Sequence, residues 1–154
     1  MRRFKQNFIF FALVFLVVSN IISAQKGTSG FEELKAWKLN FIIENTSLNT
    51  EELEAYKCIF EEYENAYHSE IWIKVQEIRK NLRQSFDTIT TSSAAIYIKD
   101  FDSFEIKGLQ MKHQRNEMLL KKIRPKEVLH ILYQEKRFDR EMLNRIKNKS
   151  KKSN

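Results

Sequence analysis

From Phe31 to the C-terminus, 124 consecutive residues contain one glycine, Gly108, and one proline, Pro125. Tight β-hairpins depend on such residues at their turns, so this stretch has few places at which an antiparallel sheet could reverse direction. Its apolar residues recur instead at spacings of three and four, which is the period of one face of an α-helix. The sequence therefore predicts an all-α fold.

The longest expected helix begins with a capping motif, Leu48-Asn49-Thr50-Glu51-Glu52. The side-chain oxygen of Asn49 can accept a hydrogen bond from a free N–H of the first turn. Glu52 lies three positions later, where its carboxylate can accept the N–H of Asn49. An apolar stripe follows from Leu53 to Leu82. We expect one helix over residues 50–83, about 50 Å long, against which the other helices pack.

The apolar stripe of this helix slips out of its heptad between Tyr67 and Ile71. This slip favours a globular packing helix over a long coiled coil. Ile71-Trp72-Ile73 alternates locally as a strand does, but the helical period holds on both sides of it. We therefore interpret the whole stretch as helical.

Three further helices are expected, over residues 31–44, from Ser92 or Ser93 to Lys122, and over 126–147. Residues 86–93 are rich in β-branched and hydroxyl side chains and are the expected long turn. Pro125 fits the first turn of a helix and not its interior, so it marks the start of the last one. Gly108 either allows a neighbouring helix to approach closely or simply weakens its own helix, by about 1 kcal/mol relative to Ala.

The N-terminus has the pattern of an export signal. The first five residues carry three basic side chains, residues 8–18 are an unbroken apolar run, and Ala24 is a plausible cleavage point. A membrane span needs roughly 20 apolar residues, so we expect the signal to be removed before Gln25. The alternative is an uncleaved signal that anchors the chain. Either form would act outside the cytoplasm, and we expect a periplasmic protein.

The expected domains follow from this pattern: a signal peptide (1–24), a flexible leader (25–30), a single helical domain (31–147) and a basic tail (148–154).

Charge is distributed unevenly along the chain, with a net charge of −6 over residues 31–65 and +9 over residues 66–154. A basic half suits nucleic acid, anionic lipid or an acidic polypeptide. An exported protein does not meet chromosomal DNA or cytosolic RNA, so export argues against nucleic acid as the partner. The lone cysteine, Cys58, cannot form a disulfide within its own chain. We expect a small buried side chain, or else a cross-link between two chains.

No residues form a recognisable catalytic or metal-binding pattern. The three histidines, His68, His113 and His130, lie on different expected helices, without the spacing of metal ligands. Paired acids such as Glu61 and Glu62 fit a solvated helix face, because nothing supplies the apolar cleft that would separate the pKa values of a catalytic pair. We therefore expect no enzyme activity, no cofactor and no bound metal.

The helical stripes also contain many aromatic and methionine side chains, whose simplest role is to fill the core. The alternative is that some of them form the floor of a concave surface for other polypeptides, with basic residues at its rim. The floor would include Tyr67, Phe101, Phe104, Met111 and Met118. The rim would include Arg79, Lys80, Arg83, Lys112, Arg115, Lys121, Lys122 and Arg124.

The capping motif resembles the Leu-Thr-x-x-Gln motif of the Spy/CpxP-type periplasmic family, with Asn49 in place of the Thr and Glu52 in place of the Gln. Residues 31–42, 122–128 and 133–143 are more specifically similar to small exported helical proteins described as "sensor of ECF-type sigma factor". A second motif copy falls at residues 123–127, without a hydroxyl cap.

The resemblance implies a bundle of four helices in the shape of a hairpin or a cradle. It also implies that two copies of the chain can form a homodimer. It implies a role in envelope stress: a chaperone for unfolded polypeptides, or a sensor that contacts a sigma or anti-sigma membrane protein. Because some relatives bind zinc, the alternative function is a zinc-binding stress protein that binds no client. The sequence does not identify the client or the stress signal.

Overall fold

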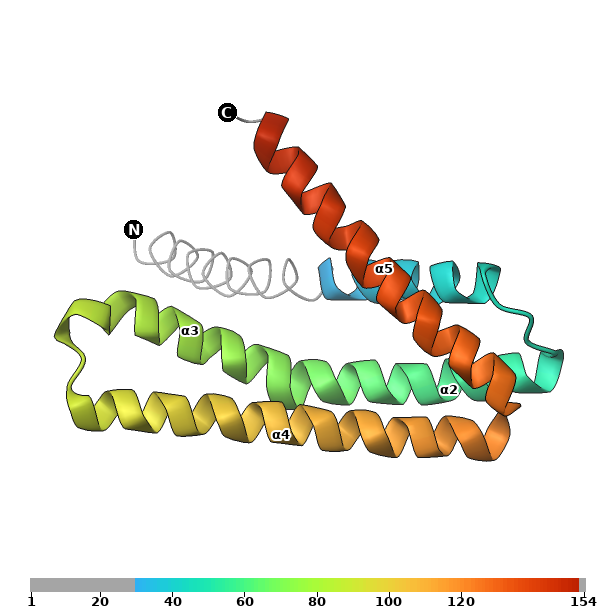
Figure 1. The fold of residues 1–154 in the computed structure, drawn as a ribbon, viewed down its shortest axis with the longest axis horizontal. Coiled ribbons are helices and arrows are strands. Elements are labelled where there is room, and N and C mark those ends of the chain that lie inside the picture. The colour runs from blue at the N-terminus through green and yellow to red at the C-terminus, as the bar shows by residue number, and fades with distance from the viewer. Residues whose placement is uncertain (1–29, 153–154) are drawn as a thin grey trace, which may run out of the picture. The chain divides into compact units, whose positions relative to one another are not determined.

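The computed structural model describes residues 30–152 of the chain, with side chains from residue 30 to residue 148. These residues are helical apart from short turns, and no strand occurs among them, so the predicted all-α fold is confirmed (Figure 1). None of the helices in this part of the chain has an apolar stretch long enough to cross a membrane. The expected signal peptide and most of the leader lie outside the described residues.

The chain divides into two compact units between Asn40 and Phe41, inside a helix that covers residues 30–44. The sequence predicts a single helical domain over residues 31–147, whereas this division falls within it. In the described part of the first unit, the ammonium of Lys35 lies 2.8 Å from the Glu32 carboxylate and 5.2 Å from the centre of the Phe31 ring. The second unit, residues 41–154, holds all the features discussed below.

The long helix predicted over residues 50–83 is present with one irregularity. It consists of α2 (Thr50–Tyr67), the π-helical turn η1 (His68–Trp72) and α3 (Ile73–Ser85). A π-turn contains one residue more than an α-turn, so it rotates the side chains that follow it. It lies where the apolar stripe slips, and the locally alternating residues there are helical rather than strand.

The connection to α4 is shorter than expected. The 3₁₀ turn η2 (Phe86–Thr88) and two further residues lead directly into α4 (Thr91–Lys122). Thr90 caps this helix, because its hydroxyl accepts the N–H of Ser93 at 3.2 Å. The expected start at Ser92 or Ser93 is thus one or two residues too late, since the neighbouring serines offered the same capping chemistry.

The α4 helix runs back beside α2, η1 and α3, so that the two long segments form a hairpin (Figure 1). Gly108 marks a close approach within it: a Cβ added there would lie 3.3 Å from Cε2 of Tyr67 and 3.5 Å from Cδ1 of Ile71. Of the two roles predicted for this glycine, the structure shows the first, close approach of a neighbouring helix. The approach is at the level of the π-turn.

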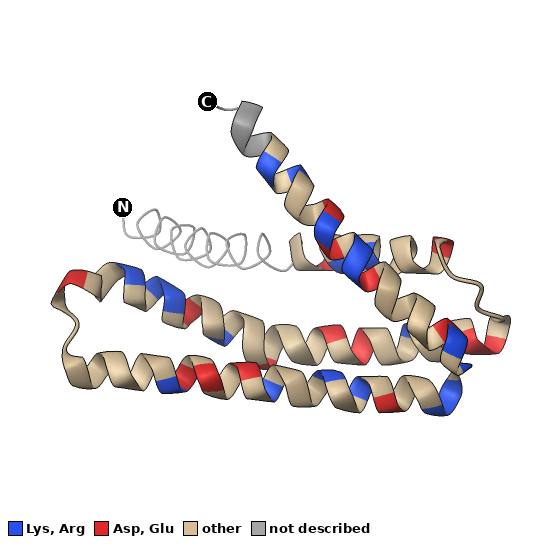
Figure 2. Cartoon of the chain, in the orientation of Figure 1, with Lys and Arg blue, Asp and Glu red and all other residues tan. Residues whose placement is uncertain are grey.

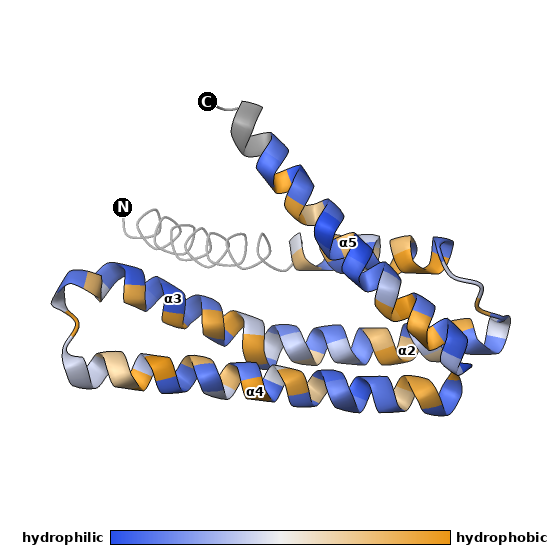
Figure 3. Ribbon diagram, in the orientation of Figure 1, coloured by the Kyte–Doolittle hydropathy of each residue, from blue (hydrophilic) through white to orange (hydrophobic). Residues whose placement is uncertain are grey.

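The α5 helix (Pro125–Lys152) follows a sharp turn at Ile123 and Arg124 and crosses the α2 end of the hairpin (Figure 1). It continues beyond residue 147, so the part of the expected basic tail up to Lys152 is helical. Apolar residues recur along each helix between hydrophilic ones (Figure 3). The buried apolar side chains of the second unit are Ile42, Tyr56, Ile59, Phe60, Ile71, Leu119, Ile123, Val128, Ile131 and Phe138.

Candidate functional site

The capping motif at the start of α2 has the predicted geometry. The Glu52 N–H donates to Oδ1 of Asn49 at 2.9 Å, and the Asn49 N–H donates to Oε2 of Glu52 at 3.1 Å. Two of the free N–H groups of the first turn are therefore satisfied.

Glu52 also binds Arg124 at the turn between α4 and α5. Nε of Arg124 donates to Oε1 at 2.7 Å, Nη2 donates to Oε2 at 2.8 Å, and the backbone N–H of Arg124 donates to Oε1 at 3.0 Å. The hydrogen bonds from the Arg124 side chain and backbone, together with that from Asn49, lower the pKa of Glu52 to about 2. The carboxylate thus closes the first turn of α2 and holds the start of α5. Arg124 was expected at the rim of a binding surface, but it is part of this connection.

Arg115 is buried, although it was predicted at the exposed basic rim of the polypeptide-binding surface. Its guanidinium donates to both carboxylate oxygens of Glu135 on α5, at 2.8 Å and 3.0 Å, and lies 4.6 Å from the centre of the Tyr63 ring. Only 5% of Arg115 is exposed. This pair was not predicted, because nothing in the local sequence links two residues on different helices.

Two tyrosines of α2 adjoin this buried ion pair. Burial raises the pKa of Tyr63 to about 12 and raises the pKa of Tyr56 further. Among the described residues, the Tyr56 hydroxyl has no hydrogen-bond partner. A buried charged group beside an unsatisfied hydroxyl is costly, so this region depends on the Arg115–Glu135 pair remaining intact.

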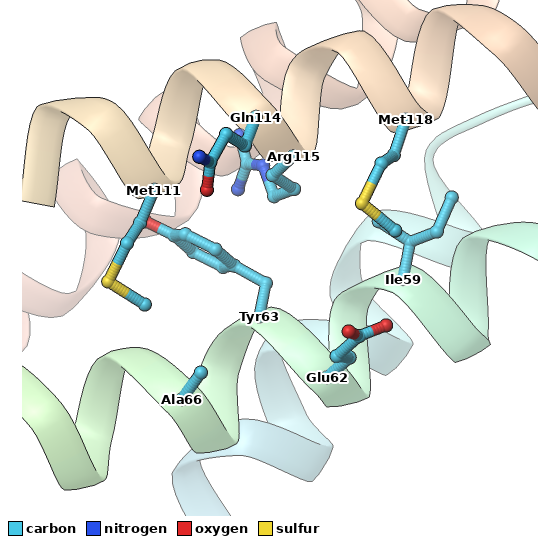
Figure 4. Close-up of a pocket in the computed structure, with 8 residues that line it drawn as sticks. All are labelled: Ile59, Glu62, Tyr63, Ala66, Met111, Gln114, Arg115 and Met118. Atoms are coloured by element: carbon cyan, nitrogen blue, oxygen red, sulfur yellow. The ribbon is translucent and has the colours of Figure 1, made fainter.

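A groove follows the seam between α2 and α4 (Figure 4). It consists of two adjoining hollows of about 110 Å³ and 420 Å³, which share Ile59, Glu62 and Met118. We call this surface the α2–α4 groove. Its remaining lining residues are Glu51, Ala55, Cys58, Tyr63, Ala66, Met111, Gln114, Arg115, Lys121 and Lys122.

The groove has an apolar floor and charged edges of opposite sign. Met111 and Met118 face Ile59, Tyr63 and Ala66 across it (Figure 4). Carboxylates line its α2 edge (Glu51, Glu62), and ammonium groups line its α4 edge (Lys121, Lys122).

Cys58 lies at this groove and is exposed. The expectation that it is a small buried side chain is therefore wrong, because the apolar stripe of α2 passes beside it through Ile59.

The structure brings together only part of the predicted polypeptide-binding surface. Met111 and Met118 line the groove, and Lys121 and Lys122 lie at its edge. Phe101 and Phe104 are half-buried on the first half of α4, and Phe101 is about 26 Å along the helix axis from Met118.

The other proposed surface residues lie away from the groove. Tyr67 packs at Gly108. Arg79 and Arg83 are exposed on α3. The surface was predicted too large, because a shared helical face does not place residues near one another along a long helix.

The histidines have separate surroundings. His68 stacks on Trp72, with ring centres 5.0 Å apart, while His113 lies 3.5 Å from Glu117 and His130 lies 3.3 Å from Glu127. Within the described residues, no group of three or more His, Cys, Asp or Glu side chains is placed to hold a metal ion.

No protein-family model, curated protein or solved structure matches the chain.

Proposed function

We propose that this protein binds other polypeptides in the α2–α4 groove and catalyses no reaction. The observation behind this proposal is that the groove has an apolar floor, which lies between charged edges of opposite sign. An apolar stretch of a client would replace water on the floor, and flanking charges of either sign would find a partner at one of the edges.

The composition of the floor supports a broad range of clients. Methionine side chains are unbranched and polarisable, so Met111 and Met118 can adapt to clients of different shape. The groove is partly open to solvent rather than enclosed, which favours reversible binding over the tight retention of one small ligand.

The setting we propose is the periplasm, in the response to envelope stress. The basic and apolar N-terminal pattern and the resemblance of residues 48–52 to the Spy/CpxP-type motif support it. In this setting the protein would protect unfolded polypeptides or report them to an ECF-type sigma-factor pathway. The zinc-binding alternative gains no support from the described side chains.

An aggregation assay tests the groove directly. The double substitution Met111→Gln and Met118→Gln makes the floor polar without adding charge. The protein should suppress the aggregation of a denatured client, and the double variant should need about five to ten times more protein for the same suppression, because each site loses much of its apolar contact.

The matched control is Leu109→Gln with Leu120→Gln. Both leucines are on α4, are 70% and 52% exposed, and do not line the groove. This variant should suppress aggregation within about twofold of the parent protein. Equal losses in the two variants, or no suppression by the parent protein, would contradict the proposal. A single stoichiometric complex with one membrane protein, without any effect on clients, would instead favour the regulatory form of the hypothesis.

A further inference from the structure

The α5 helix has two halves with different surroundings. Its buried side chains are Glu127, Val128, Ile131, Glu135 and Phe138. Phe138 packs on Phe41, with ring centres 5.6 Å apart. Beyond Phe138, no described side chain is buried, although the helix continues to Lys152, about 21 Å further.

Positive charge is concentrated in this second half. Residues 136–152 hold eight basic and two acidic residues, a net charge of +6, compared with +7 for the whole chain. Lys and Arg recur along this part of α5 up to the last described side chains (Figure 2). Since the rest of the chain is close to neutral overall, a charge-driven partner would be directed to this segment.

The same segment carries an exposed apolar row. Leu143 and Ile146 are 57% and 59% exposed, and Met142 beside them is half-buried. At 100° per residue, the three side chains fall within an arc of about 100°. At the same 100° per residue, Lys147 flanks this arc on one side and Arg145 lies on the other.

We infer that residues 136–148 bind an anionic lipid surface, with the helix lying in the plane of the membrane. The apolar row would enter the boundary between head groups and acyl chains, while the flanking side chains of Arg145 and Lys147 reach the lipid phosphates. A flat anionic surface satisfies both flanks of the row at once. A nucleic acid would leave the apolar row in water, and an acidic polypeptide would need a recess shaped to the row.

This inference does not depend on client binding in the α2–α4 groove, because the groove is formed by α2 and α4 alone. It also differs from membrane spanning, since an interfacial helix needs only one apolar face. The charge in this segment predicts attraction that weakens as salt increases.

The test is vesicle flotation of the exported protein, purified with the N-terminus that the producing cell gives it. The vesicles are phosphatidylcholine alone, or phosphatidylcholine with phosphatidylglycerol. We expect at least about tenfold stronger partitioning into the anionic vesicles, and a clear loss of that preference in high salt.

Two variants separate charge from apolar contact. Replacing Lys136, Arg140 and Lys147 with Gln should weaken partitioning into anionic vesicles about tenfold or more. The matched control replaces Arg79, Lys80 and Arg83 of α3 with Gln, which removes the same charge and should change partitioning by no more than about twofold.

Replacing Leu143 and Ile146 with Asn tests the apolar row. This variant should weaken partitioning into anionic vesicles about fivefold, with an unchanged circular dichroism spectrum because neither side chain is buried.

Equal partitioning into neutral and anionic vesicles would overturn the inference. Equal losses in the α5 and α3 charge variants would also overturn it, since net charge alone would then explain the binding. Binding to polyglutamate without binding to anionic vesicles would overturn the inference of a lipid partner and indicate an acidic polypeptide as the partner instead.

Discussion

The two ends of the α2–α4 hairpin differ in what they bury. At one end, which we call the packed end, α2 and residues 108–122 of α4 are joined by residues 125–138 of α5. This end contains the Glu52–Arg124 and Arg115–Glu135 pairs. At the other end, which we call the two-helix arm, α3 lies beside residues 91–107 of α4 and is joined to them through η2. No described side chain of the arm is buried.

This difference shows that helical periodicity does not by itself specify a stable core. Both ends have amphipathic helices, but two helices leave much of each apolar face in water. Several large apolar side chains of the arm are therefore exposed: Ile73, Phe86, Ile96, Ile98 and Ile106. Because few buried contacts oppose its opening, the arm is expected to open locally at a lower free energy than the packed end.

Breaking the buried ion pair should have the largest effect on stability. Glu135→Ala leaves the Arg115 guanidinium buried without its carboxylate, which typically costs about 3 to 5 kcal/mol. The free energy of unfolding, measured by urea titration with circular dichroism, should fall by that amount. A loss below about 1 kcal/mol would mean that Arg115 reaches water, and that the packed end is less closed than we describe.

A substitution at the border of the two regions should have an intermediate effect. Gly108→Val adds a branched side chain within 3.3 Å of the Tyr67 ring, so we expect a loss of about 1 to 3 kcal/mol from crowding.

Gly108→Ala is the control for this substitution. Its gain in helix propensity, about 1 kcal/mol, offsets a milder contact. If the Val variant unfolds at the same urea concentration as the Ala variant, the close approach at the π-turn does not constrain the hairpin.

Acid should affect the packed end through Glu52. Because its pKa in the folded protein is about 2, below the usual value of 4.5, its contribution to stability is complete above pH 4.5 and is lost as the pH falls towards 2. Glu52→Gln should therefore lower the melting temperature at neutral pH and flatten its decline between pH 4.5 and 2. Parallel declines in the two proteins would show that other carboxylates govern acid unfolding.

The smallest effect is expected where the two-helix arm meets η1. Glu70 and Lys107 pair across the hairpin at 2.7 Å, but their side chains are 50% and 46% exposed. Exposed pairs typically contribute up to about 1 kcal/mol, so Glu70→Ala should change the free energy of unfolding by no more than that. A larger loss than that of Glu135→Ala would reverse the comparison between the two ends.

The sequence predicted features that depend on near neighbours in the chain. It predicted the helices and the capping box of Asn49 and Glu52, because both follow from local spacing and residue type. For Gly108 it left two roles open, of which close approach is the one present.

Features that join distant residues were missed. Glu52 and Arg124 are 72 residues apart, and Arg115 and Glu135 are 20 apart. Charge alone made both arginines look solvated, since a sequence does not show which carboxylate will lie opposite. Met142 and Ile146 share the stripe of Phe138 but extend past the core, so periodicity overestimated the buried length of α5.

The single carboxylate of Glu52 has a consequence for cooperativity. It accepts the backbone N–H of Asn49 and that of Arg124, so the beginnings of two helices depend on the same acceptor. Fraying at one beginning releases the restraint on the other. We therefore expect the turn before α2 and the turn before α5 to open together, and an insertion that lengthens either turn to loosen both.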